Sequence, residues 1–475
     1  MGKFTVLDRD TEVKDVLFEN PDFTSIILWK PVQSGKTSDV LKLAEVFYKE
    51  SALLFISDKN TALAGQTNGR AKVLGFEVTN YRDGDRLGKV LRNGVGRKKI
   101  LHLLMEVNNL KAVITILEVL EDLPVTVVID EADKSRSTEL ANKKKLDEEE
   151  EEELEVADGS SLPPVTLMLL QIKNLLKNRE NSRTIFVSAT PAAVLTAEKD
   201  NWLVMYKEPY KNYVGVGINH PAEIHVSKTY IPENRCKARE RWTNGRNDQL
   251  LNSFYGPLTY GVDAFAKSVN RSEDENITQI MLVSLENRKA QQFQMAEFVK
   301  NQLMELGANH VGVEVFNSDT KEDSTTTLAD IIKSNGKKKV IIIAGFMASR
   351  GVSFTDYSDK ENMFELILQV HYTKKSFPLN SSMQNMRIFG PARRTVNRPM
   401  IICNDVCHED INRNFSESYR IIRELAEYGF ATQGYYNPQR PLTQPYNFRY
   451  LKQGWKPECF IFPSTNEADH LPIVP

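Results

Sequence analysis

The sequence predicts an α/β fold with two tandem parallel sheets that are covered by helices. The first observation is the length of 475 residues, which exceeds one ordinary domain and suits two separate cores. The second is a series of short apolar runs, such as 25–30 and 183–188, which alternate with amphipathic stretches. Strands that are apolar enough to be buried on both faces are typical of parallel sheets between layers of helices.

The predicted strands fall into two series along the chain. The first series consists of 25–30, 52–57, 100–104, 125–130 and 183–188, and the second of 279–284, 310–316, 339–345 and 366–372. The predicted organisation is a first domain over 1–205, a linker with an inserted, mostly helical element over 206–275, a second domain over 276–425 and an irregular extension over 426–475. Within the first domain, an acidic insertion over 140–160 carries the run DEEEEEELE. Such a run is typical of a solvated loop, and mimicry of a nucleic acid is the alternative.

The composition excludes several classes of protein. With 41% hydrophobic and 26% charged residues, the chain has the composition of a globular protein. No run approaches the roughly 18 to 20 apolar residues of a membrane span, and the N-terminus lacks the pattern of a signal peptide. Four cysteines make no disulfide framework. We expect an intracellular protein, cytoplasmic or virus-encoded and acting inside the host cell, with no membrane partner.

The strongest local motif is QSGKTS, which directly follows a predicted strand and precedes a predicted helix. In a phosphate-binding loop the backbone N–H groups surround the phosphates, Lys36 reaches the β and γ oxygens, and the Thr37 hydroxyl binds Mg²⁺. Lys30 stands where the pattern GxxxxGK[ST] has its first glycine, so the motif taken alone fits a surface turn equally well. The candidate nucleotide-binding residues of this loop are Gln33, Ser34, Gly35, Lys36, Thr37 and Ser38.

Two adjacent carboxylates end the predicted strand 125–130. Ligands of open α/β sheets bind at the carboxyl ends of the strands. There, Asp130 would hold Mg²⁺, and Glu131 would position and polarise the water that attacks ATP. The alternative is a helix cap, but a carboxylate pair beside a buried strand is costly without a cation. ATP and Mg²⁺ are therefore the predicted cofactors.

With these motifs in place, the chain resembles the superfamily 2 helicases of the DEAD/DEAH type. DEAD at 130–133 is the signature of many members, and SAT at 188–190 is similar to their third motif. The resemblance implies two tandem RecA-like P-loop NTPase domains. It also implies that Ser188, Ala189 and Thr190 couple hydrolysis to movement. By the same analogy, Gln66 and Arg70 contact the nucleic-acid backbone, although ordinary exposed helix residues explain them equally well.

The second domain carries a segment that resembles the fifth helicase motif, usually ARGxD. Here it is ASRGVSF, which implies that Ser349 and Arg350 contact nucleic acid. Gly351 would permit close approach of the backbone to a phosphate. Ser353 replaces the aspartate of the family, so the resemblance does not extend to a contact with the nucleotide sugar.

A further segment, MQNMRIFG, is similar to the sixth motif, QxxGRxxR. The resemblance implies that Arg387 is an arginine finger, which stabilises charge on the transferring phosphoryl group. Met386 stands at the glycine position and Gly390 at the second arginine position. Arg393 or Arg394 is then the substitute for a nucleotide contact, and a structural ion pair is the alternative for each arginine.

The predicted function is that of an ATP-dependent nucleic-acid helicase or translocase, which hydrolyses ATP between two RecA-like domains. With these departures from the motifs, the chain resembles a divergent bacterial or viral branch of the helicases. This resemblance favours DNA over RNA as the partner. With a net charge of −2, the nucleic-acid site would be a local cleft. One alternative is a packaging-type ATPase with a nuclease, which requires acidic metal ligands in the second half. The other is a scaffold subunit that binds ATP without separating strands.

Overall fold

The computed structural model describes most of two α/β units. The described residues are 3–31, 33–57, 61–81, 87–130, 164–189, 202–215, 220–221, 223–226, 248–268, 276–284, 289–317, 327–345, 352–357, 359–371, 385–396, 398–403, 407–408 and 411. The division between the units falls between Tyr210 and Lys211. The predicted acidic insertion and the predicted C-terminal extension lie outside the described residues.

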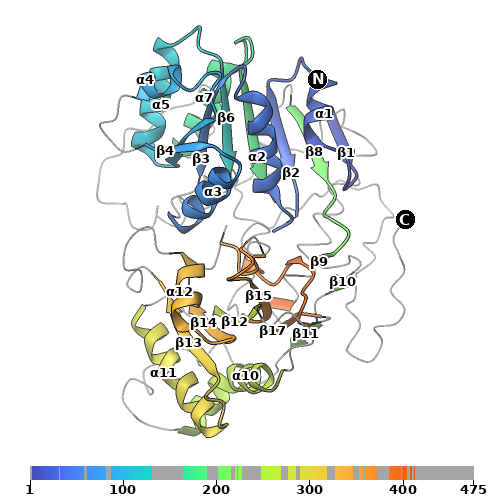
Figure 1. Cartoon of the computed structure of the whole chain (residues 1–475), viewed down its shortest axis with the longest axis vertical. Helices are drawn as coiled ribbons and strands as arrows, with labels where there is room; N and C mark the ends of the chain where they lie inside the picture. Colours follow the sequence, from blue (N-terminus) through green and yellow to red (C-terminus); the bar gives the residue numbers. More distant parts are fainter. Residues whose placement is uncertain are drawn as a thin grey trace, which may run out of the picture. The chain divides into compact units, whose positions relative to one another are not determined.

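The first unit is built on an eight-stranded sheet with the order β1-β8-β2-β7-β6-β3-β5-β4. All of its neighbouring strands run parallel. The strands are β1 (Lys3–Leu7), β2 (Ser25–Trp29), β3 (Ala52–Ser57), β4 (Glu77–Asn80), β5 (Lys99–Leu104), β6 (Val125–Asp130), β7 (Arg183–Ser188) and β8 (Trp202–Lys207). The helices are α1 (Val13–Phe18), α2 (Lys36–Phe47), α3 (Thr61–Val73), α4 (Leu87–Arg92), α5 (Val107–Val119) and α7 (Pro164–Leu176) (Figure 1).

The core of the first unit lies on both faces of this sheet. Strand β2 shows the reason, because Ile26 and Leu28 face one apolar cluster while Ile27 and Trp29 face the other. The first cluster includes side chains of α1, α2 and α3, and the second includes side chains of α4, α5 and α7. Burial on both faces explains why these strands are nearly continuous apolar runs.

The second unit has a six-stranded sheet with the order β11-β17-β15-β12-β14-β13, and its neighbouring strands are also parallel. The strands are β11 (Glu223–Val226), β12 (Thr278–Ser284), β13 (Val311–Phe316), β14 (Lys339–Ala344), β15 (Phe364–His371) and β17 (Met400–Cys403). The helices are α10 (Asp248–Lys267), α11 (Lys289–Glu305) and α12 (Leu328–Asn335) (Figure 1). A small sheet joins β9 (Tyr213–Gly215) to β10 (His220–Pro221) and β16 (Gly390–Pro391).

These two parallel sheets confirm the predicted α/β fold class with two tandem units, each a parallel sheet covered by helices. Every predicted strand of both series corresponds to an observed one, with ends that differ by no more than about two residues. Among the helices of the described residues, none combines the length and the apolar character that a membrane span requires.

The segment that was predicted as a linker differs from this expectation. Strand β11 pairs with β17, and helix α10 buries Leu258, Val262 and Phe265 in the core of the second sheet. Both elements are therefore parts of the second unit, which begins at Lys211 and not at residue 276. Among the described residues of 206–275, α10 is a helix, whereas β9, β10 and β11 are strands, and the apolar face of α10 covers a sheet.

Gly261 marks where α10 approaches the second sheet most closely. A Cβ atom there would lie 3.0 Å from side-chain atoms of Met281 and Val370, and 3.1 Å from Ile402. Replacement of Gly261 by valine is therefore expected to destabilise the chain by about 1 to 3 kcal/mol through overpacking. Gly69 in α3 is the matched control, because a Cβ atom added there would meet no atom within 4 Å apart from its chain neighbours and the backbone of its own helix. Chemical denaturation of both variants checks the prediction, and equal stability of the two would contradict the packing of α10.

Candidate active site

The phosphate-binding loop connects β2 to α2 in the first unit. Gly35 has φ 87° and caps α2, and Gln33 has φ 54°. Lys30 is not among the described residues with positive φ, so its position does not require glycine. The carbonyl of Gln33 accepts a hydrogen bond of 3.2 Å from the Tyr210 hydroxyl. Gly35, the N-cap residue, has no side chain to cap the first turn of α2, which leaves the positive end of the helix for an anion.

A buried group of charges lies beneath this loop. Lys30 forms an ion pair with Asp39 of α2, and Lys207 at the end of β8 lies 3.5 Å from the other carboxylate oxygen of Asp39. Burial lowers the pKa of Lys30, and Asp39 opposes this effect. Lys36 is also buried, with 8% of its surface exposed. Three lysines beside one aspartate give this region an excess of positive charge, which favours a polyanionic ligand.

Strand β7 links the phosphate loop to the predicted coupling motif. It lies between β2 and β6, so its end, with Ser188 and Ala189, reaches the same edge of the sheet. The carbonyl of Ser188 accepts a bond of 3.3 Å from the amide of Lys30. The carbonyl of Ala189 accepts one of 3.0 Å from the indole of Trp29. The first two residues of the motif are thus tied to the base of the loop, and Thr190 lies outside the described residues.

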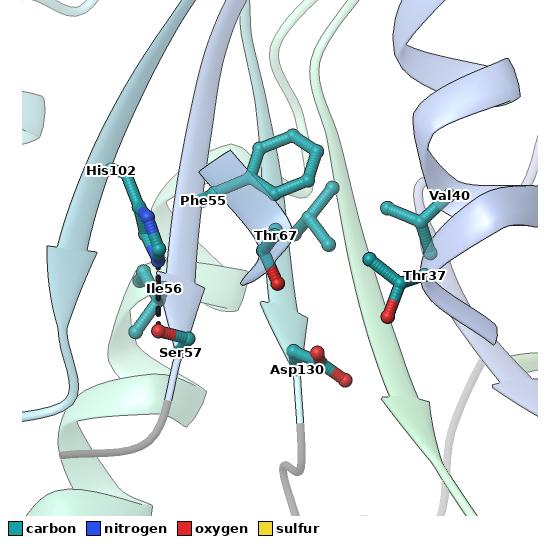
Figure 2. A pocket seen from close by; sticks show the side chains of 9 residues that line it. Thr37, Val40, Phe55, Ile56, Ser57, Thr67, His102 and Asp130 are labelled. Carbon is teal, nitrogen blue, oxygen red and sulfur yellow. Dashed lines mark hydrogen bonds between the residues drawn. The ribbon is translucent and has the colours of Figure 1, made fainter. Parts of the chain in front are cut away.

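The two predicted magnesium ligands line one small cavity at this edge. Thr37 and Asp130 share it with Ser57, Thr67 and His102 and with the apolar side chains of Val40, Phe55, Ile56 and Val128, and Figure 2 shows the side chains around it. A hydroxyl and a carboxylate are hard oxygen donors of the kind that Mg²⁺ prefers. The residues present therefore fit a magnesium ion that is bound with a nucleotide. Glu131, the predicted water-positioning residue, lies outside the described residues.

A hydrogen-bonded chain of side chains runs beside the cavity. The Ser57 hydroxyl donates to Nε2 of His102 at 2.8 Å, and Nδ1 of His102 donates to Asn68 Oδ1 at 2.5 Å. The Asn68 amide donates to Asn80 Oδ1 at 2.8 Å. This chain fixes α3 against β3, β5 and β4. Gln66 and Arg70, the predicted nucleic-acid contacts, lie in the same helix and are half-buried.

Acidification tests the neutral state of His102. Burial lowers its pKa to about 4 from an ordinary value of 6.5. Because the folded pKa lies below the unfolded one, the stabilisation is present above pH 6.5 and is lost as the pH falls towards 4. Between pH 8 and pH 5 the loss is about 2 kcal/mol. We expect the wild-type chain to lose this much more stability than a His102→Gln variant, as measured by urea denaturation at both pH values. Parallel losses in the two proteins would mean that His102 is not buried in the neutral form.

Arg387 lies in the second unit, in a segment that β15 holds in place. Gln369 of β15 donates to the carbonyl of Asn385 at 2.9 Å and accepts from the amide of Ile388 at 3.0 Å. The backbone on both sides of Arg387 is therefore fixed. The Arg387 side chain is 1% exposed. Gly390 has φ 146° and pairs with Val214 of β9, which explains why glycine stands at the position of the second arginine.

Arg393 and Arg394 have different surroundings. The guanidinium of Arg393 donates to the carbonyls of Leu366, Ile388 and Pro391. These bonds brace the backbone, and this geometry does not support the predicted nucleotide contact of Arg393. Arg394 is exposed and stacks on Tyr357 at 4.4 Å, so its charge is accessible to a ligand.

The buried carboxylate of Glu365 holds the segment that contains these two arginines. It accepts bonds from the amides of Arg394 and Thr395, each at 2.8 Å, and from the Tyr357 hydroxyl at 2.6 Å. Together with desolvation, its charge raises the pKa of Tyr357. In the neighbouring fifth motif, Ser353 bonds within its own turn to the carbonyl of Thr355 at 3.1 Å. Ser349, Arg350 and Gly351 lie outside the described residues.

Sequence reasoning missed Asp39, Lys207, Thr67 and His102 as parts of this site. The sequence gives one signal for Asp39. It is a carboxylate in the first turn of the helix that follows the phosphate-binding loop, where a second negative charge beside a bound anion needs a lysine partner. For the other three, only the tertiary structure brings them to the loop and the cavity.

No protein-family model matches the chain, and no curated protein sequence is similar to it. Similar solved structures include the Mycobacterium smegmatis helicase Lhr bound to ssDNA and AMP-PNP, with 12% identity and a TM-score of 0.47. That comparison covers 85% of this chain and 46% of the other, so this chain spans less than half of the length of Lhr. Saccharomyces cerevisiae Dbp5 bound to RNA and ADP BeF3 has 13% identity and a TM-score of 0.46, over 86% of this chain and 91% of that one. A DEAD box protein from Methanococcus jannaschii has 14% identity and a TM-score of 0.37, over 86% and 88% of the two chains.

Proposed function

We propose that this protein is an ATP-dependent motor that hydrolyses ATP to move along or open nucleic acid. The observation that carries the proposal is the position of Thr37 and Asp130. They lie far apart in the sequence, since Thr37 comes after β2 and Asp130 ends β6, and both line one cavity beside the phosphate loop. This is the placement of a hydroxyl and a carboxylate that a magnesium-bound nucleotide requires.

The charges around the loop support a nucleoside triphosphate as the ligand. Lys30 and Lys207 pair with Asp39, and the charge of the buried Lys36 acts on Lys30, so the three lysines outweigh the one aspartate. The positive end of α2 adds to this field, because Gly35 opens the helix without a side-chain cap. A ligand with several negative charges compensates these groups better than a neutral substrate does.

Hydrolysis transfers the γ-phosphoryl group of ATP to water. The new bond joins the water oxygen to the γ phosphorus, and the bond from that phosphorus to the bridging oxygen breaks, which leaves ADP and phosphate. In this proposal Lys36 neutralises the β and γ oxygens, and Glu131 orients the water and accepts its proton. Arg387 stays our candidate for the arginine that stabilises charge on the γ-phosphate. Magnesium, when bound, would withdraw charge from the same oxygens.

The nucleic-acid partner is proposed from the arrangement of α3. This helix carries Gln66 and Arg70, and its residues Thr67 and Asn68 reach the nucleotide cavity and the His102 chain. One helix therefore has side chains for both sites. DNA is the partner that we favour, and Ser188, Ala189 and Thr190 are the proposed coupling residues between hydrolysis and movement.

Steady-state ATP hydrolysis tests the proposal. The purified chain would be assayed alone and with single-stranded DNA, duplex DNA and RNA, beside a Glu131→Gln variant. Stimulation by one polymer, absent in the variant, is the expected result and identifies the substrate class. Hydrolysis that no polymer changes would contradict the motor, and no hydrolysis with any of them would favour an ATP-binding scaffold.

A further inference from the structure

Gln33 has an unusual backbone conformation in the phosphate-binding loop. Its φ of 54° lies in the left-handed region, which side chains other than glycine adopt at a cost in energy. Such a conformation persists only where neighbouring groups hold it. An anion site made of backbone N–H groups also requires that the carbonyls of the loop find donors elsewhere. A donor to the carbonyl of Gln33 therefore holds the loop in the form that binds phosphates.

Tyr210 supplies this donor from a distant part of the chain. Its hydroxyl donates to the carbonyl of Gln33 at 3.2 Å, although the two residues are 177 positions apart in the sequence. The Tyr210 side chain is half-buried. Two positions earlier, the amide of Glu208 donates to the carbonyl of Leu7 at 3.0 Å. The segment that carries Tyr210 is thus fixed to the first sheet, and its hydroxyl is a defined support of the loop.

The chain enters the second unit directly after Tyr210. Asn212 is already bound there, because its carbonyl accepts a hydrogen bond of 2.7 Å from the amide of Ala392. Strand β9, which follows, pairs with β16. These partners belong to the segment that contains Arg387. A single residue, Lys211, therefore separates a residue that is bonded to the phosphate loop from one that is bonded to the arginine segment.

A connection of one residue transmits movement. The Cα atoms of Tyr210 and Asn212 are joined by two peptide units, which span at most about 7 Å. Hinges between domains are a few residues that absorb changes in backbone dihedral angles. With Lys211 alone between the two anchors, a movement of the second unit is absorbed at this one residue or passed to Tyr210. A displaced Tyr210 no longer supports the carbonyl of Gln33.

We propose that Tyr210 is a positioning residue that couples the phosphate-binding loop to the chain that enters the second unit. Its hydroxyl holds Gln33 in the conformation that binds the phosphates. When nucleic acid moves the second unit, Lys211 passes the movement to Tyr210, and the affinity of the loop for nucleotide changes. This inference rests on the proposed function, and it assigns the coupling to a residue outside the motifs.

The first measurement is the affinity of the full-length chain for a fluorescent, non-hydrolysable ATP analogue with Mg²⁺, at a temperature at which all variants are folded. Tyr210→Phe removes only the hydroxyl, and we expect the affinity to fall by about 5-fold, the effect of losing one hydrogen bond. Tyr48→Phe is the matched control. It removes a hydroxyl at the other end of α2 and keeps the ring that packs against Phe76, so the wild-type affinity is expected.

The second measurement is the coupling ratio, which is the affinity for the analogue with a single-stranded oligonucleotide divided by the affinity without it. Oligothymidine and oligouridine are the probes. In the wild-type chain and in Tyr48→Phe, the preferred strand should change the affinity by about 5-fold or more. The ratio should fall towards one in Tyr210→Phe and in a variant with two glycines inserted between Tyr210 and Lys211. The insertion keeps the hydroxyl, so the analogue alone should bind with wild-type affinity. A purely structural role of Tyr210 would not separate the two quantities in this way.

Two results would overturn the inference. One is wild-type affinity for the analogue in Tyr210→Phe, because the loop would then not depend on the hydroxyl. The other is a wild-type coupling ratio in the glycine insertion, because the short connection would then transmit nothing. If the wild-type chain does not bind the analogue, or if no strand changes its affinity, the proposed function itself fails, which is a distinguishable outcome.

Discussion

Replacement of Lys36 by alanine is expected to lower the rate of ATP hydrolysis by about 10²- to 10³-fold, the usual effect of removing one group that stabilises transition-state charge. Lys36 opens α2 directly after Gly35, whose φ of 87° turns the chain into the helix. Its position relative to the loop is therefore fixed by the backbone. No neighbouring lysine replaces it, because Lys30 and Lys207 are both paired with Asp39.

Lys42 provides the matched control for this prediction. It lies in the same helix, but its side chain is 52% exposed and pairs at 3.3 Å with Glu12 at the surface. Lys42→Ala should hydrolyse ATP at the wild-type rate, since an exposed ion pair contributes little to stability. The prediction is checked by the steady-state rates of ATP hydrolysis of the wild-type chain, Lys36→Ala and Lys42→Ala. Their melting temperatures show whether each variant is folded. A folded Lys36→Ala variant with more than half of the wild-type rate would show that the loop does not bind the phosphates.

The sequence predicts the central strands because their burial leaves a clear pattern. Strands β2, β3 and β6 are buried along nearly their whole length and are mostly apolar, since helices cover both faces of the sheet. The edge strands give no such signal. Strand β4 (EVTN) is partly exposed along its length, and it is a strand only because β5 pairs with it. Strand β8 is apolar, but it lies at the predicted end of the first domain and was not recognised.

The site divides in the same way between local and long-range information. The loop residues Gly35, Lys36 and Thr37 are adjacent in the sequence, so a motif is sufficient to find them. The ion pair of Lys30 with Asp39 depends on the position of α2 relative to the loop that precedes it. The contact of Lys207 with Asp39 depends on the pairing of β8 with β2. No local pattern contains that information.

The second unit shows a further limit of motif spacing. Arg393 stands near the position where the sixth motif has an arginine, and spacing alone assigns it to the nucleotide. In the structure its donors are directed to three backbone carbonyls, while Arg394 is exposed. Which of two adjacent arginines is accessible depends on the backbone of the turn, here fixed by Glu365.

Replacement of Asp39 by asparagine is expected to destabilise the chain by about 3 to 5 kcal/mol, the usual cost of leaving a buried charge uncompensated. Asp39 is 7% exposed, and both Lys30 and Lys207 are paired with it in the described structure. Its loss leaves two buried ammonium groups facing a neutral amide. Lys30→Met should cost less, because Asp39 then keeps its pair with Lys207. Urea denaturation of the variants measures both effects.

The pH dependence of the Asp39→Asn variant identifies the charge that causes the loss. Burial lowers the pKa of Lys30 below its ordinary value of 10.5, and without Asp39 the pKa should fall further. A lysine with a lowered folded pKa destabilises the fold while it is protonated, so the loss of stability is full near pH 7 and shrinks as the pH rises towards 10.5.

The double variant Lys30→Met, Asp39→Asn should recover part of the stability at pH 7. Glu12→Gln, which breaks only the exposed pair with Lys42, should change the stability by less than about 1 kcal/mol. A deficit that is independent of pH, with no recovery in the double variant, would mean that Asp39 stabilises α2 by some means other than its lysine partners.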